Sequence, residues 1–141
     1  MRIYLASRYS RREELCTYRA ELEEAGHTVT SRWLNGNHQI DDQGLSAQAA
    51  ETERVRFASE DWHDLTTADC CISFTEAPRS TSSRGGRHVE FGAALAAGLG
   101  CIVIGPRENV FHCLPQVRWF PDWATFQAAP ATALLIDGQV S

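Results

Sequence analysis

RIYLASRYSRREELCTYRAELEEAGHTVTSRW, residues 2–33, is the stretch that decides the fold. It opens with a short apolar strand, RIYLAS (2–7), and closes with HTVTSRW (27–33), which alternates like a second strand. Between them, apolar residues recur at helical spacing: Leu15, Tyr18, Leu22 and Ala25. A strand–helix–strand unit of this kind is typical of a parallel sheet.

The ends of this first helix have their own signals. Ser10 and Glu13 are spaced as a capping box, in which each residue would satisfy a free backbone N–H at the helix start. Gly26 is placed to end the helix.

Strands and helices continue to alternate along the rest of the chain. We expect a helix over 46–66, a buried strand over 68–76, a helix over 89–98, a strand over 101–106, a short strand over 117–120 and a helix that starts at Pro121 within 121–136. The inward positions of the helix over 46–66 are expected to be Ala50, Val55 or Phe57, Ala58, Trp62 and Leu65. The expected fold is a single α/β domain over 1–141, a three-layer flavodoxin- or Rossmann-like sandwich with about four or five parallel strands.

Composition limits the possible functions. The chain has 141 residues, 43% of them hydrophobic, and no apolar run approaches the length of a membrane span. The apolar run near the N-terminus is too short for a signal peptide, so we expect a cytoplasmic protein with no membrane partner. A net charge of −5 argues against binding a nucleic acid polymer.

All 13 basic residues are Arg, because the sequence has no lysine. This excludes Schiff-base chemistry and a Walker lysine, and leaves Arg to bind phosphate or carboxylate. Genome composition would also explain the bias. The five cysteines include no C-x-x-C pair. Cys70, Cys71 and Cys101 lie in apolar strand-like runs, so we expect these three to be buried, reduced thiols. We expect no metal and no cofactor.

Polar segments cluster where the expected strands end, which is where parallel sheets of this kind bind ligands. They are ASRYSRR, SRWLNGNH, TEAPRSTSSRGGRHVE and GPRENVFH. Ser7, Ser10 and three Arg precede the first helix, where an anion would be favoured. Arg84, Arg87 and Arg107 could add positive charge to the same rim, although an exposed basic turn would show the same pattern.

Glu90 is the first candidate for chemistry. It lies among apolar residues at a helix start, and Gly85, Gly86 and Gly92 let backbone come close on either side. An ordinary first-turn Glu is one explanation, because the helix dipole favours it there. A buried carboxylate beside a ligand cleft can instead act as a nucleophile or as an acid or base.

Asp61 is the second candidate. It lies near the end of the long helix, with Asp64 and Asp69 close in sequence. A nucleophilic carboxylate together with one that protonates the leaving group is the logic of glycosyl transfer. A solvated helix face would also place an Asp here. On the same rim, Trp33 could stack a base, and His38, Asn109 or His112 could read one, but ordinary packing also accounts for each of them.

Two ordered motifs resemble the nucleoside 2-deoxyribosyltransferase family, which includes the deoxynucleoside 5′-monophosphate N-glycosidases. They are D-x-x-x-L-x-x-A-D, starting at Asp61 and ending at Asp69, and G-x-x-x-E-x-G, which is Gly86, Glu90 and Gly92. The resemblance extends over nearly the whole chain and includes IYLAS near its start.

The resemblance implies specific roles. Glu90 would attack C1′ of the sugar, Asp61 would hold and protonate the departing base, and Tyr4 would orient the nucleophile. Ser7 and neighbouring basic residues would hold a 5′-phosphate. The family builds its sites at dimer interfaces, so the resemblance implies a homodimer or a higher homo-oligomer.

The sequence departs from the family at two positions. Arg84 stands six residues before Glu90, where nucleoside-specific members carry Asp and nucleotide hydrolases usually carry Ser. His88 replaces a common Gly. An Arg can bind a phosphate through two hydrogen bonds, which favours a phosphorylated substrate over a free nucleoside, although Arg84 could instead face solvent.

The expected function is cleavage of the N-glycosidic bond of a (deoxy)nucleoside or its 5′-monophosphate, by hydrolysis or by transfer to another base. The expected substrate-binding residues are Ser7, Arg8, Arg12, Trp33, Ser83, Arg84, Gly86, His88 and Asn109. Two alternatives stay open: a non-catalytic nucleotide sensor, and a glycohydrolase of NAD or of modified nucleotides on the same scaffold.

Overall fold

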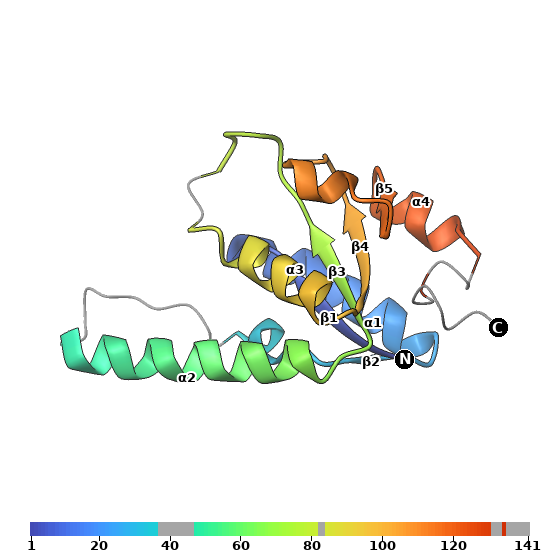
Figure 1. Cartoon of the computed structure of the whole chain (residues 1–141). Helices are drawn as coiled ribbons and strands as arrows, with labels where there is room; N and C mark the ends of the chain where they lie inside the picture. The colour runs from blue at the N-terminus through green and yellow to red at the C-terminus, as the bar shows by residue number, and fades with distance from the viewer. Residues whose placement is uncertain (37–46, 82–83, 131–133, 135–141) are drawn as a thin grey trace.

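In a computed structural model, residues 1–36, 47–81, 84–130 and 134 are described, and they contain a five-stranded, fully parallel sheet (Figure 1). The strand order is β2-β1-β3-β4-β5. The strands are β1 (Arg2–Ala6), β2 (Thr28–Val29), β3 (Cys70–Phe74), β4 (Gly100–Ile104) and β5 (Val117–Phe120). The expected α/β fold with a parallel sheet is therefore confirmed.

Helices cover both faces of the sheet. They are α1 (Arg12–Glu24), α2 (Ala47–Thr66), α3 (Gly86–Ala96) and α4 (Trp123–Ala128), with short 3-10 helices η1 (Tyr9–Arg11), η2 (Arg32–Asn35) and η3 (Val110–Cys113). Figure 1 shows α3 crossing the front of β3 and β4, and α2 packs beside α3. On the other face, Tyr18 of α1 stacks on Phe74 of β3 and on Trp123 of α4, with ring centroids 5.4 and 4.2 Å apart.

The central strands lie in the core. Every residue of β3 is buried, as expected for a strand with helices on both faces. Tyr4, Cys71 and Cys101 are paired in register across β1, β3 and β4, so their side chains point to the same face. All five cysteines are free thiols.

The second strand is much shorter than the expected 27–33. Side chains replace its ladder: the hydroxyl of Ser31 accepts the N–H of Leu5 at 2.7 Å, and Nε1 of Trp33 donates to the carbonyl of Leu5 at 2.9 Å. The backbone N–H and carbonyl of Leu5 in β1 therefore have hydrogen-bond partners without a longer second strand. The strand ends at Val29, and η2 begins at Arg32.

Two expected helix starts are also wrong. Ser10 does not cap α1, because it lies inside η1 and the helix begins two residues later. The start of α4 is capped by Asp122, whose carboxylate accepts the N–H of Thr125 at 2.8 Å, and Pro121 precedes that cap. The expected end of α1 is confirmed, since Gly26 follows it with a φ of +97°.

The long helix was expected over 46–66 and spans Ala47–Thr66, but its inward face is only partly as expected. Ala50, Phe57 and Leu65 are buried, whereas the side chains of Val55 and Trp62 are 60% and 53% exposed and Ala58 is exposed. No helix within the described ranges is both long and apolar enough to cross a membrane.

Candidate functional site

Three of the expected catalytic groups meet between the sheet and the two helices on its front face. Tyr4 comes from β1, Asp61 from the last turns of α2 and Glu90 from the start of α3. Burial raises the pKa of Tyr4, and Glu90 and Asp61 raise it further. Asp61 also raises the pKa of Glu90, so the three groups form one electrostatic cluster. The strand order reverses between β1 and β3, and ligands of open parallel sheets bind at such a point.

Glu90 carries a strongly shifted carboxyl group. Burial raises its pKa to about 8; the Tyr4 hydroxyl lowers the value and the nearby Asp61 raises it. Although Glu90 keeps some surface exposure, its Oε2 atom is fully buried. Neither this oxygen nor the Tyr4 hydroxyl has a partner with good hydrogen-bond geometry among the described residues, despite their proximity. Two such buried polar atoms side by side favour a binding or catalytic role.

Asp61 has a different environment. Burial raises its pKa to about 7, the carboxylates of Asp64 and Glu60 raise it further, and Arg32 lowers it. Asp64 is itself buried and accepts both the backbone N–H and Nε of Arg32 at 3.0 Å. Asp64 thereby holds η2 against α2, and Asp61 is left as a carboxyl group that can carry a proton near neutral pH.

The raised pKa of Glu90 predicts a stability effect that does not depend on function. Its folded-state pKa of about 8 lies above the ordinary glutamate value of 4.5, so the unfolded chain binds fewer protons between these values and stability falls as pH rises through this window. Glu90→Gln removes this penalty. Relative to wild type, its free energy of unfolding should gain roughly 2–3 kcal/mol between pH 6 and pH 9.

Denaturant melts of both proteins across that pH range check the prediction. Glu51→Gln, at an exposed position of α2, is the matched control and should show no such gain. A pH-independent difference between wild type and Glu90→Gln would contradict a buried, protonated Glu90.

The basic residues before α1 differ in how far they are engaged. Arg11 binds Glu14 at 2.7 Å, Glu76 at 2.8 Å and the carbonyl of Thr75 at 3.2 Å. Among the described residues Arg8 has a single ion pair, from Nε to Glu76 at 3.2 Å, and its side chain is 36% exposed. Arg8 is therefore freer than Arg11 to meet an anion at the end of β1.

Ser7 and Arg12 flank this segment. The hydroxyl of Ser7 donates to the carbonyl of Arg8 at 2.9 Å, which leaves its oxygen able to accept. The guanidinium of Arg12 lies against Gly36, where a Cβ would come within 2.6 Å of Nη2. Arg12 thus packs on the end of η2, to one side of Glu90's helix.

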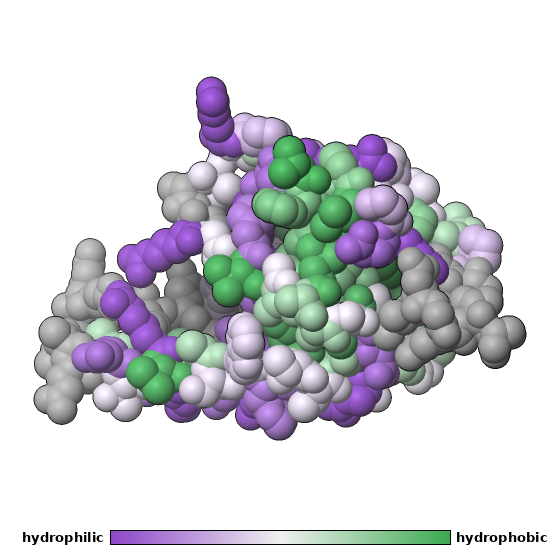
Figure 2. Space-filling view, viewed as in Figure 1, coloured by the Kyte–Doolittle hydropathy of each residue, from purple (hydrophilic) through white to green (hydrophobic). Residues whose placement is uncertain are grey.

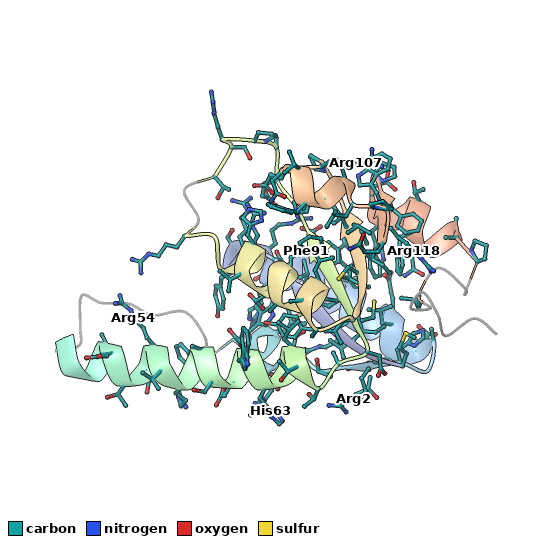
Figure 3. The ribbon with its side chains drawn as sticks, viewed as in Figure 1. Arg2, Arg54, His63, Phe91, Arg107 and Arg118 are labelled. Carbon is teal, nitrogen blue, oxygen red and sulfur yellow. The ribbon has the colours of Figure 1, made fainter. Side chains whose placement is uncertain are left out.

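Arg87 does not add charge to the rim. Arg87 is only 4% exposed. Its two terminal nitrogens both donate to the carboxylate of Glu108, with Nη2 at 2.8 Å from Oε2. Arg84, in contrast, is exposed, and Arg107 lies beyond the end of β4 with its guanidinium over the ring of Trp119 (Figure 3).

Glu108 is a residue that the sequence reasoning missed. Burial raises its pKa, but hydrogen bonds from Arg87 and from the backbone N–H of Glu76 lower it to about 2. A signal was available in the sequence: Arg87, Phe91 and Ala94 share the buried face of α3, so a buried Arg there required a carboxylate from another element.

The other expected binding residues lie in several environments. Trp33 is buried in the core and tilts against Tyr9, with 6.1 Å between their ring centroids. Asn109 caps η3 through the N–H of Phe111 at 3.0 Å. Gly86 is exposed at the first position of α3, where a Cβ would meet nothing within 4 Å. Ser83 and His38 lie outside the described residues.

His88 lies on the outer side of α3. Its Nε2 is 3.3 Å from Glu108, and its side chain lines a mainly apolar cavity of about 780 Å³ between α3 and η3. Figure 2 shows apolar side chains gathered on this face of the molecule. Within the described ranges, no cluster of acidic, His or Cys side chains is arranged to hold a metal ion.

The five-stranded parallel sheet with helices on both faces places the chain in a defined structural class, the Rossmann-like α/β sandwiches. Its solved neighbours include a 2-deoxyribosyltransferase from Bacillus psychrosaccharolyticus, with a TM-score of 0.71, 20% identity, and coverage of 96% of this chain and 97% of that one. A CMP N-glycosidase from Clostridium botulinum aligns with a TM-score of 0.51, 22% identity, and coverage of 85% and 87%. No family model and no curated protein sequence matches the chain.

The fold is thus that of two enzymes of the nucleoside 2-deoxyribosyltransferase kind, which is the resemblance that the two sequence motifs indicate. At 20–22% identity the likeness concerns the fold. The roles of individual residues rest on the geometry described above.

Proposed function

We propose that the chain is an N-glycosidase or deoxyribosyltransferase that cleaves the bond between base and sugar of a nucleoside or its 5′-monophosphate, with Glu90 as the nucleophile. The observation that carries the proposal is the buried carboxyl of Glu90 beside Tyr4 and Asp61 at the point where the strand order reverses. The activities of the two structural neighbours support the same reaction class.

The proposed reaction has two steps. An oxygen of ionised Glu90 attacks C1′ and displaces the base, which takes the proton of Asp61; a glycosyl-enzyme ester remains. Water or a second base then attacks C1′, the bond from C1′ to Glu90 breaks to restore the carboxylate, and the proton of the attacking group returns to Asp61. Tyr4, buried beside Glu90, orients the attacking carboxylate.

The direct test is a panel of ribo- and deoxynucleosides and their 5′-monophosphates, with base release followed by chromatography, in the presence and absence of an acceptor base. The proposal predicts release from at least one member. Release from none of them, combined with tight binding by calorimetry, would favour a nucleotide sensor instead. NAD in the same panel tests the second alternative, a glycohydrolase of NAD.

A homo-oligomer stays a prediction, to be checked by light scattering.

Asp61 should determine the alkaline side of the pH–rate profile. Wild-type kcat/KM requires ionised Glu90 and protonated Asp61, so we expect a bell between apparent pKa values of about 7 and 8, which belong to the coupled pair. Asp61→Asn should lower kcat/KM by about 10²–10³-fold and leave a single limb that rises with pH. Its midpoint should fall below that of Glu90 in wild type, because the Asp61 charge no longer raises the pKa of Glu90.

A substrate whose leaving group needs no proton, such as a nitrophenyl deoxyriboside, separates this role from misfolding. It should restore most of the activity of Asp61→Asn. An unchanged bell in Asp61→Asn would contradict the assignment.

Arg84 is proposed to bind the 5′-phosphate, because it is exposed and the structure describes no ion pair for it. Arg84→Ala should lower kcat/KM for monophosphates by about tenfold, with nucleosides little affected, since a charge-assisted hydrogen bond contributes about 1.5–3 kcal/mol. Arg79→Ala, at another exposed position of the same loop, is the control. An unchanged ratio of monophosphate to nucleoside turnover would remove Arg84 from the phosphate site.

A further inference from the structure

The first turn of α3, which leads into the turn that presents Glu90, is held by a carboxylate from a different element. Glu108, in the loop after β4, accepts both terminal nitrogens of Arg87 and lies 3.3 Å from Nε2 of His88. Arg87 and His88 are the second and third residues of α3, directly before the turn that presents Glu90.

The carboxylate of Glu108 contacts side chains, Arg87 and His88, of the first turn of α3. Gly85, the residue before α3, is in the left-handed conformation with a φ of +83°, and as a glycine it has no side chain of its own with which to cap the helix. The first turn contains no acidic residue and does contain Arg87, which the helix dipole disfavours. Glu108 supplies the negative charge that this end of the helix lacks.

Glu108 is itself fixed on both sides. Its Oε1 accepts the backbone N–H of Glu76, at the end of β3, at 3.0 Å. Its own N–H donates to Nδ1 of His112 at 2.9 Å, and the buried ring of His112 packs edge-on against Phe91 with centroids 4.9 Å apart. The ends of β3 and β4 and the start of α3 are therefore joined through one carboxylate.

We propose that Glu108 is a positioning residue: by fixing Arg87 and His88 to the ends of β3 and β4, it sets the direction in which Glu90 faces Tyr4 and Asp61. This role in catalysis rests on the proposed function, whereas the placement of Glu90 by Glu108 does not. A displaced first turn would move Glu90 away from the buried groups that face it, Tyr4, Asp61 and Cys71.

The test that needs no activity is a carboxyl ¹³C NMR titration of the unliganded full chain, comparing wild type, Glu108→Gln and Glu21→Gln. Glu21 accepts from Gln127 at 3.2 Å on the opposite face of the sheet and is the matched control. The titration midpoint of Glu90 should fall by at least one pH unit in Glu108→Gln and stay unchanged in Glu21→Gln. An unchanged midpoint in a folded Glu108→Gln protein would overturn the proposal.

Kinetics give the second readout. Glu108→Gln should lower kcat about 10–100-fold with less than a threefold change in KM, because a misplaced nucleophile affects the reaction step more than substrate binding. Glu108→Asp, if less impaired than Glu108→Gln, indicates that the charge carries the role. Should Glu108→Gln unfold, Arg87→Gln replaces it, with the same two readouts and the same expected shifts. If wild type releases no base, that result counts against the proposed function alone. The NMR titration still tests whether Glu108 sets the position of Glu90.

Discussion

Replacing Glu90 with Gln is expected to lower the rate of base release by about 10³-fold or more, since loss of a covalent nucleophile removes the main reaction path. The amide has nearly the shape of the carboxylate, so the cluster with Tyr4 and Asp61 should keep its packing. An amide does not attack C1′ at a useful rate. KM should change little, because the buried carboxyl is expected to act in the reaction step.

The measurement is single-turnover base release by wild type and Glu90→Gln on the best substrate of the panel. Mass spectrometry of wild type quenched during turnover should show the added mass of the sugar, and that adduct should be absent from the variant. Equal release by the two proteins would falsify the assignment of Glu90. A folding control comes from the pH-dependent melts, in which the same variant should be more stable than wild type at alkaline pH.

Glu90 could be singled out from the sequence because of its neighbours. A carboxylate between Val89 and Phe91 at a helix start had to be exposed, paired or functional, and the structure buries one of its oxygens next to Tyr4. The contribution of Asp61 was harder to anticipate. Its pKa is raised by burial and by the carboxylates of Asp64 and Glu60. Arg32, 29 residues earlier in the chain, lowers it, and its place depends on the fold of η2.

The strands and helices of the centre of the fold were predictable from local patterns, although two helix starts were not. β3 and β4 follow from continuous apolar runs, and the limits of α2 follow from helical spacing. The early end of β2 could not be predicted this way, because it depends on Ser31 and Trp33 bonding to the backbone of Leu5 across the sheet. The partner of Arg87 is another long-range choice: its burial was readable from the spacing of α3, but the sequence did not reveal which carboxylate would meet it.

Arg87→Met is expected to destabilise the fold by about 3 kcal/mol, because breaking a buried ion pair leaves its other member without compensation. The side chains of Arg87 and Glu108 are only 3% and 12% exposed. Met keeps the apolar length of the Arg side chain, so the loss reports mainly on the charge. Chemical denaturation at pH 7 measures the difference from wild type. Glu53→Gln, which breaks the exposed ion pair with Arg56, should change stability by less than about 1 kcal/mol.

The pH dependence of that loss identifies its cause. The folded-state pKa of Glu108 is about 2, below the ordinary glutamate value of 4.5, so its stabilising contribution is complete above pH 4.5 and is lost as the pH falls toward 2. The difference between wild type and Arg87→Met should therefore shrink over this range. The double variant Arg87→Met/Glu108→Leu should regain at least half of the lost stability at pH 7, because no unpaired charge remains. If the double variant is instead as unstable as the sum of the two single changes, the pair does not act as a unit, and the start of α3 is held by packing around Phe91 rather than by charge.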